Sequence, residues 1–114
     1  MQIQFNSDSS VMGTDNVAER IEAMLREKLG RFESRVTRLE VHVSDENGDK
    51  GGGNDKRCMI EARPAGGKPI GVTEHAGQVD DAARRAANTI AQRLERLFDK
   101  EDRGRHEPRP DKVI

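Results

Sequence analysis

The segment from Arg38 to Asp45 alternates apolar and polar side chains. In an extended chain its apolar residues, Leu39, Val41 and Val43, share one face, and the polar residues between them share the other. Such a strand needs cover on one face only, while the other face stays in water. The segment therefore predicts a sheet with one buried face and one wet face.

Three further segments are typical of strands. Gln2–Phe5 alternates in the same way, and so does Lys56–Arg63, which places Cys58 on its inward side. Pro69–Thr73 is a shorter apolar segment that follows a tight turn. Between the second and third strands, Glu46–Asp55 contains Asn-Gly and Gly-Gly-Gly, which predicts a long hairpin loop.

Two segments change to helical spacing. From about Asn16 to Phe32, apolar residues recur every three or four positions and form one stripe. A longer stripe runs from about Gln78 to Lys100, and its first part is mostly alanine, which would let this helix lie close to the sheet. The apolar stripe of the first helix is Val17, Ile21, Met24, Leu25 and Leu29, and that of the second is Val79, Ala83, Ala86, Ala87, Ile90, Leu94 and Leu97.

The predicted element order is β-α-β-β-β-α. Because a helix joins the first two strands, we expect them to be parallel and connected in the right-handed sense, with hairpins joining the others. The fold class is α+β: a two-layer sandwich in which a four-stranded sheet carries both helices on one face. We expect residues 1–100 to form this domain and residues 101–114, which hold two prolines and many charges, to form a disordered charged tail.

Several features favour the cytoplasm. No segment approaches the roughly 18 apolar residues of a membrane span. The N-terminal residues Met1–Phe5 lack the basic start and apolar run of a signal peptide. The single cysteine cannot form an internal disulfide, which fits a reducing compartment.

The residues that could support catalysis are scattered. His42, His75 and His106 have no second ligand at metal-binding spacing, and Cys58 is alone and on an inward face. We expect Cys58 to be a buried inert thiol, and His42 to be a solvent-facing strand residue or an RNA contact. The sequence predicts no enzyme, no cofactor, no metal site and no small-molecule substrate.

Two loops imitate known motifs without completing them. Asp45–Asp49 opens like a calcium-binding loop, but Lys50 and Lys56 replace the glycine and glutamate that such a loop requires. Gly66-Gly67-Lys68 hints at a phosphate-binding loop, yet it lacks the upstream glycine and is followed by proline. We interpret the first as an acidic hairpin loop and the second as a turn.

The charged residues indicate where a nucleic acid would bind. The net charge of −1 argues against binding through bulk charge, so a local basic patch is needed. On helical spacing, basic and polar residues gather on flanks beside the apolar stripes, where phosphates can reach them. On the first helix these are Arg20 and Arg31, with Lys28 nearer the core edge; on the second they are Arg85, Thr89, Gln92, Arg96 and Lys100, with Arg93 beside them.

A solvated helix surface is the alternative explanation of these residues. Glu27 lies between Arg20 and Arg31 on the first helix, and two acidic residues lie close to Arg96 and Lys100 on the second. Basic side chains alone are therefore a weak indication of function.

Particular residues add a resemblance to a known family. Lys28-Leu29-Gly30-Arg31-Phe32-Glu33, the strand Leu39–Val43 and the Ala-then-Leu pattern through Ala82, Ala83, Ile90 and Leu94 resemble the short ribosome hibernation-promoting factors, a family that includes the ribosome-associated inhibitor. The resemblance covers about residues 1–100. It implies a fold similar to double-stranded-RNA-binding domains and a stress-response or stationary-phase factor that silences or protects idle ribosomes in slow growth. It also implies 16S rRNA of the small ribosomal subunit as partner, bound in the channel of messenger and transfer RNA.

The resemblance also assigns residues. Lys28, Arg31 and Arg96 fall on basic positions of the family. Thr89 and Gln92 stand where members usually carry Lys and Arg, while Arg85 and Arg93 supply charge nearby; the family's frequent aromatic residue near the start of the second helix is missing. The sequence lacks the additional C-terminal dimerisation domain of the long members, so ribosome pairing by that domain is not expected. We expect the protein to be a monomer. A protein-interaction module that uses the open sheet face or an edge strand is the alternative function, motivated by the near-neutral charge.

Overall fold

The computed structural model describes residues 1–7, 16–46 and 55–106, with side chains up to residue 103. The elements follow the predicted order β-α-β-β-β-α, which is confirmed. They are β1 (Gln2–Ser7), α1 (Val17–Leu29), the 3-10 turn η2 (Gly30–Phe32), β2 (Val36–Asp45), β3 (Lys56–Pro64), β4 (Ile70–Ala76) and α2 (Val79–His106).

The sheet has the strand order β1-β2-β3-β4. Strand β1 is parallel to β2, as predicted for two strands joined by a helix, and Phe5 lies opposite Val41. The other two pairs are antiparallel, so that Val41, Ile60 and Val72 form one row across three strands. Because side chains alternate along each strand, this register places all of these apolar residues on the same face.

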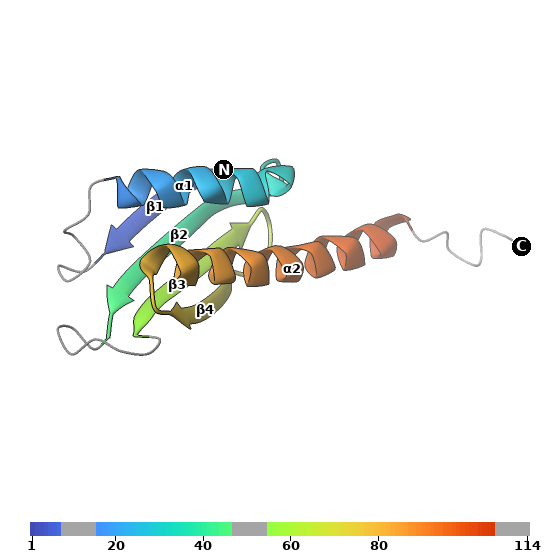
Figure 1. Ribbon diagram of the computed structural model, residues 1–114. Coiled ribbons are helices and arrows are strands. Elements are labelled where there is room, and N and C mark those ends of the chain that lie inside the picture. The colour runs from blue at the N-terminus through green and yellow to red at the C-terminus, as the bar shows by residue number, and fades with distance from the viewer. Residues whose placement is uncertain (8–15, 47–54, 107–114) are drawn as a thin grey trace, which may run out of the picture.

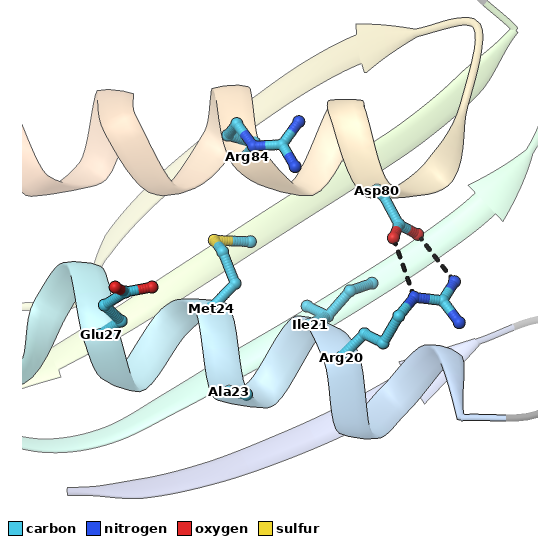
Figure 2. A pocket seen from close by; sticks show the side chains of 7 residues that line it. All are labelled: Arg20, Ile21, Ala23, Met24, Glu27, Asp80 and Arg84. Carbon is cyan, nitrogen blue, oxygen red and sulfur yellow. Dashed lines mark hydrogen bonds and ion pairs between the residues drawn. The ribbon is translucent and has the colours of Figure 1, made fainter.

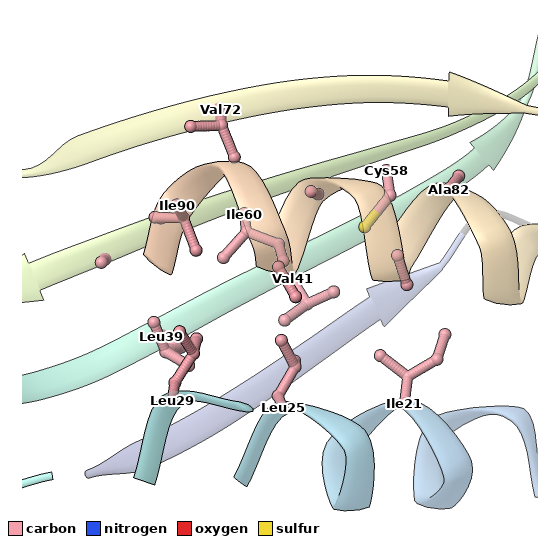
Figure 3. Close-up of a cluster of buried hydrophobic side chains, with 14 of the residues drawn as sticks. Ile21, Leu25, Leu29, Leu39, Val41, Cys58, Ile60, Val72, Ala82 and Ile90 are labelled. Atoms are coloured by element: carbon pink, nitrogen blue, oxygen red, sulfur yellow. The ribbon is translucent and has the colours of Figure 1, made fainter. Parts of the chain in front are cut away.

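Both helices cover that face (Figure 1). Val41, Ile60 and the α1 residue Leu25 are fully buried, and Figure 3 shows the α1 side chains pointing toward those of the sheet. On the other face, Glu40 and His42 remain partly exposed. The predicted two-layer sandwich, with one covered and one open sheet face, is confirmed.

The alanines of α2 set how the helix meets the sheet. Ala82, Ala83, Ala86 and Ala87 are all 0% exposed, and α2 packs mainly on β3 and β4. Small side chains let the helix backbone approach the sheet, where larger ones would hold it away. The predicted stripe of this helix omitted two buried apolar side chains, Ala82 and Phe98, and the Phe98 ring packs against Phe32.

Several boundaries differ from the prediction. The first helical segment ends at Leu29 and tightens into η2, and β4 continues past Thr73 to Ala76, which pairs with Lys56. The predicted domain boundary at residue 100 lies inside α2, which continues to His106 (Figure 1). The expected loop at Glu46–Asp55 falls largely on residues 47–54, and the expected tail beyond 106 on residues 107–114, both outside the described residues.

No helix of the described part has the length and apolar character needed to cross a membrane.

Candidate nucleic-acid interface

The predicted contact residues lie on two separate flanks of the helical layer. Arg20 on α1 and Arg31 in η2 point toward α2, because their guanidinium groups contact Asp80 and Glu95 on that helix. The α2 residues lie on the side of that helix that faces β4 and points away from α1, as the contacts of Arg85 show. We call this second group the α2 flank: Arg85, Thr89, Gln92, Arg93, Arg96 and Lys100. The structure therefore divides the candidate residues instead of joining them on one face.

The α2 flank begins with two residues that are tied to β4. Arg85 Nη1 donates a hydrogen bond of 2.7 Å to the backbone carbonyl of His75, and Thr89 Oγ1 donates one of 2.9 Å to a carboxylate oxygen of Glu74. These contacts connect the start of α2 to the edge strand of the sheet. They give Arg85 and Thr89 a structural role whatever else they bind.

The rest of the α2 flank is open. Arg93, Arg96 and Lys100 are exposed, and no carboxylate of residues 1–7, 16–46 or 55–103 lies within ion-pair distance of any of the three. At 100° per residue Arg103 extends the same line by one turn. Its guanidinium group lies 3.6 Å from Asp99, in a pair whose side chains are 76% and 67% exposed. The sequence prediction missed Arg103 because it placed this residue in a tail.

Arg20 is held by two hydrogen bonds. Its Nε and Nη2 donate to the two carboxylate oxygens of Asp80 at 3.0 and 3.1 Å (Figure 2). These bonds, followed by the charge of Asp80, raise the pKa of the Arg20 guanidinium. The pair closes one end of a groove between the two helices, with a volume of about 400 Å³, that Met24 and Glu27 also line.

Arg31 lines a second hollow, together with Phe32 and Phe98. Its Nη2 is 3.5 Å from Glu95 Oε1, and its guanidinium carbon lies 4.6 Å from the centroid of the Phe32 ring. Lys28, between the two arginines in sequence, is half-buried and has no carboxylate at ion-pair distance in the described part of the chain. Of these three candidates, Arg20 and Arg31 thus contact acidic residues of α2 and Lys28 does not.

The open sheet face carries a balanced set of charges. Glu40 accepts from Arg38 at 2.6 Å and has Arg63 and His42 at 3.7 Å. Glu61 pairs with Arg63 at 3.1 Å on the neighbouring strand. His42 therefore lies on the sheet face opposite the helices, away from both groups of candidate RNA contacts.

The groups that could support catalysis are inert or isolated in the structure. Cys58 is 0% exposed, and its burial raises the pKa of the thiol to about 12, against a small opposing effect of Arg57. This agrees with the buried, unreactive thiol expected from the strand pattern. Within the described residues, no three or more His, Cys, Asp or Glu side chains gather in a way that could hold a metal ion.

Known structures share this fold. The N-terminal domain of Protein Y from Thermus thermophilus is similar with a TM-score of 0.67 and 20% sequence identity, over 85% of this chain and 99% of that chain. A ribosomal subunit interface protein from Coxiella burnetii is similar with a TM-score of 0.66 and 13% identity, over 86% of this chain and 98% of that chain. At these identities the likeness concerns the fold.

The sequence comparison identifies the family. No curated protein matches the chain significantly. The family described as sigma 54 modulation protein / S30EA ribosomal protein matches residues 9–102, which include α1, the sheet from β2 onward and most of α2. Together with the fold, this match confirms the resemblance predicted from the sequence. The chain belongs to the sigma 54 modulation protein / S30EA ribosomal protein family.

Proposed function

We propose that this protein is a ribosome-associated factor that works by binding and not by catalysis. Family membership supports an association with the ribosome. The structurally similar protein from Coxiella burnetii is described as a ribosomal subunit interface protein, which supports binding at a subunit interface. The proposed partner is 16S rRNA in the channel for messenger and transfer RNA. In this proposal the protein binds it as a monomer in the cytoplasm.

The observation that carries the proposal is the open part of the α2 flank. Arg93, Arg96 and Lys100 stand in solvent on one side of a helix, with no carboxylate of the described residues at ion-pair distance. At about 1.5 Å per residue, the line from Arg85 to Lys100 is roughly 22 Å long. Cations placed along such a line suit the phosphate backbone of an RNA, because each phosphate contact releases condensed counterions.

In this proposal the protein affects translation by occupying the channel of the small subunit. A domain that fills the channel of messenger and transfer RNA excludes both ligands without any chemical step. Such a factor would silence or protect idle ribosomes during slow growth and stress.

The test uses purified small ribosomal subunits and co-sedimentation at several salt concentrations. The triple variant Arg93→Gln, Arg96→Gln and Lys100→Gln should bind more weakly, and its slope of log K against log salt should be smaller by about two to three. Arg85 is left intact because its hydrogen bond to His75 supports the sheet edge.

The matched control is Arg26→Gln, Arg57→Gln and Lys68→Gln, which removes the same number of positive charges from other surfaces. It should bind nearly as well as the wild type. Equal weakening of the two triple variants, or no binding by the wild type at low salt, would refute the proposal. Binding that survives high salt and RNase treatment would instead favour a protein partner on the open sheet face.

A further inference from the structure

We infer that Asp80 and Glu95 act as internal competitors of RNA, since they occupy the guanidinium groups of Arg20 and Arg31. The inference rests on the proposed function and extends it: Arg20 and Arg31 form a restrained part of the interface. The open cations Arg93, Arg96 and Lys100 form a permanent part.

The geometry of the first pair carries the argument. Asp80 takes two guanidinium donors of Arg20 in the two-bond arrangement that an arginine also offers to a phosphate (Figure 2). A phosphate oxygen pair that approached Arg20 would compete for the same N–H groups. Asp80 therefore stands where an RNA phosphate would bind.

The second pair repeats this relationship at Arg31, which lies in η2 just beyond the end of α1. Glu95 lies 3.5 Å from Arg31, whose guanidinium group is stacked over the Phe32 ring. The contact with the ring restricts the Arg31 guanidinium group, while Nη2 of that group faces the Glu95 carboxylate. The two contacts lie at separate hollows beside α2, so a phosphate strand that reached both arginines would have to displace both carboxylates.

Because both ion pairs are partly exposed, they should weaken the binding of RNA by Arg20 and Arg31 without preventing it. Side-chain exposures are 46% and 40% for Arg20 and Asp80, and 57% and 67% for Arg31 and Glu95. Ion pairs at such exposure are weak and are screened by salt. Each carboxylate should therefore lower RNA affinity severalfold without abolishing binding.

The experiment measures the affinity of the full chain for purified small ribosomal subunits. The double variant Asp80→Asn and Glu95→Gln should bind about four- to twenty-five-fold more tightly than the wild type, from about two- to fivefold for each released arginine. Its salt slope should be steeper by about one to two, because more phosphates are contacted. The control Glu22→Gln and Glu33→Gln makes the same change in net charge, but these carboxylates face Arg26 and the N-terminal amine instead of Arg20 and Arg31. It should raise the affinity much less.

A second arm separates release of the arginines from a general change in charge. Arg20→Gln and Arg31→Gln should cost little in the wild type but should cancel the gain in the double variant. A gain that persists without these arginines, or that equals the gain of the control, would overturn the inference.

Thermal melting checks that each variant folds. Because Asp80 lies in the first turn of α2, the single variant Glu95→Gln repeats the test with a residue outside that turn. Failure of the wild type to bind would overturn the proposed function as well. Wild-type binding with no gain on neutralising Asp80 and Glu95 would overturn this inference alone.

Discussion

The guanidinium carbon of Arg35 lies 4.2 Å from the centroid of the Phe98 ring. The same guanidinium group donates hydrogen bonds of 3.2 and 3.1 Å to Glu101 and Asp102. One residue just before β2 thus holds the last buried side chain in the part of α2 whose side chains are described, Phe98, and the charged turn that follows it. This contact explains why the helix continues where the local sequence resembles a tail.

Replacing Arg35 should loosen the end of α2. In Arg35→Gln the turns beyond Phe98 lose their tertiary anchor, and the cation–π contact and ion pairs together contribute about 1 kcal/mol. We expect a smaller helical signal in circular dichroism and faster amide exchange in residues 99–103, with the rest of the domain unchanged. Arg103→Gln, which removes only a pair within the helix, is the control; an equal effect of both variants would contradict the anchoring role.

Removing the Phe98 ring should destabilise the whole domain. The ring is 6% exposed and lies 5.6 Å from that of Phe32, at an interplanar angle of 46°. Phe98→Ala should lower the free energy of unfolding by about 3–5 kcal/mol, because it removes apolar contacts and leaves a cavity. Urea denaturation measures this loss. The half-buried neighbour Leu97→Ala should cost clearly less, and a reversed order would show that Phe98 lies outside the core.

Enlarging an alanine under α2 should also destabilise the protein. Ala86 is 0% exposed where the helix packs on the sheet. Ala86→Leu adds volume that this contact cannot accept, at a cost of about 1–3 kcal/mol. Ala23→Leu makes the same change on the exposed side of α1 and should stay within about 0.5 kcal/mol of the wild type in the same denaturation experiment. Tolerance at Ala86 would mean that the helix can move away from the sheet.

The Cys58 thiol should be unreactive in the native protein. Burial raises its pKa from 9.0 to about 12, so that the nucleophilic thiolate is scarce at pH 8 as well as inaccessible. A thiol reagent such as DTNB should react slowly with the folded chain and rapidly in urea. Rapid native reaction would place the thiol at the surface.

The same pKa predicts a dependence of stability on alkaline pH. The unfolded thiol ionises near pH 9 while the folded thiol stays protonated, so the folded state loses relative stability as pH rises from about 9 to 12. Below pH 9 both states are protonated and the contribution is constant. Cys58→Ala should lack this part of the alkaline loss, and parallel urea titrations at pH 7 and pH 10.5 measure the difference.

The local sequence determined the elements and their faces. The alternation of Leu39, Val41 and Val43 dictates which side of β2 is buried, because the side-chain period of a strand is two. The 3–4 residue spacing of the α1 and α2 stripes likewise determines which side of each helix meets the sheet. These patterns depend only on neighbouring residues, so the order of elements, the two-layer fold and the candidate basic residues could all be predicted.

Only the tertiary structure decided the end of α2 and the division of the basic residues. Arg35 lies 66 positions from Glu101 in sequence, and Arg20 lies 60 positions from Asp80. No helical spacing relates such residues; their contacts exist only because the sheet brings α1 and α2 side by side. Which arginines are held by carboxylates, and which stand open to a phosphate, is therefore a property of the packed helices and not of either helix alone.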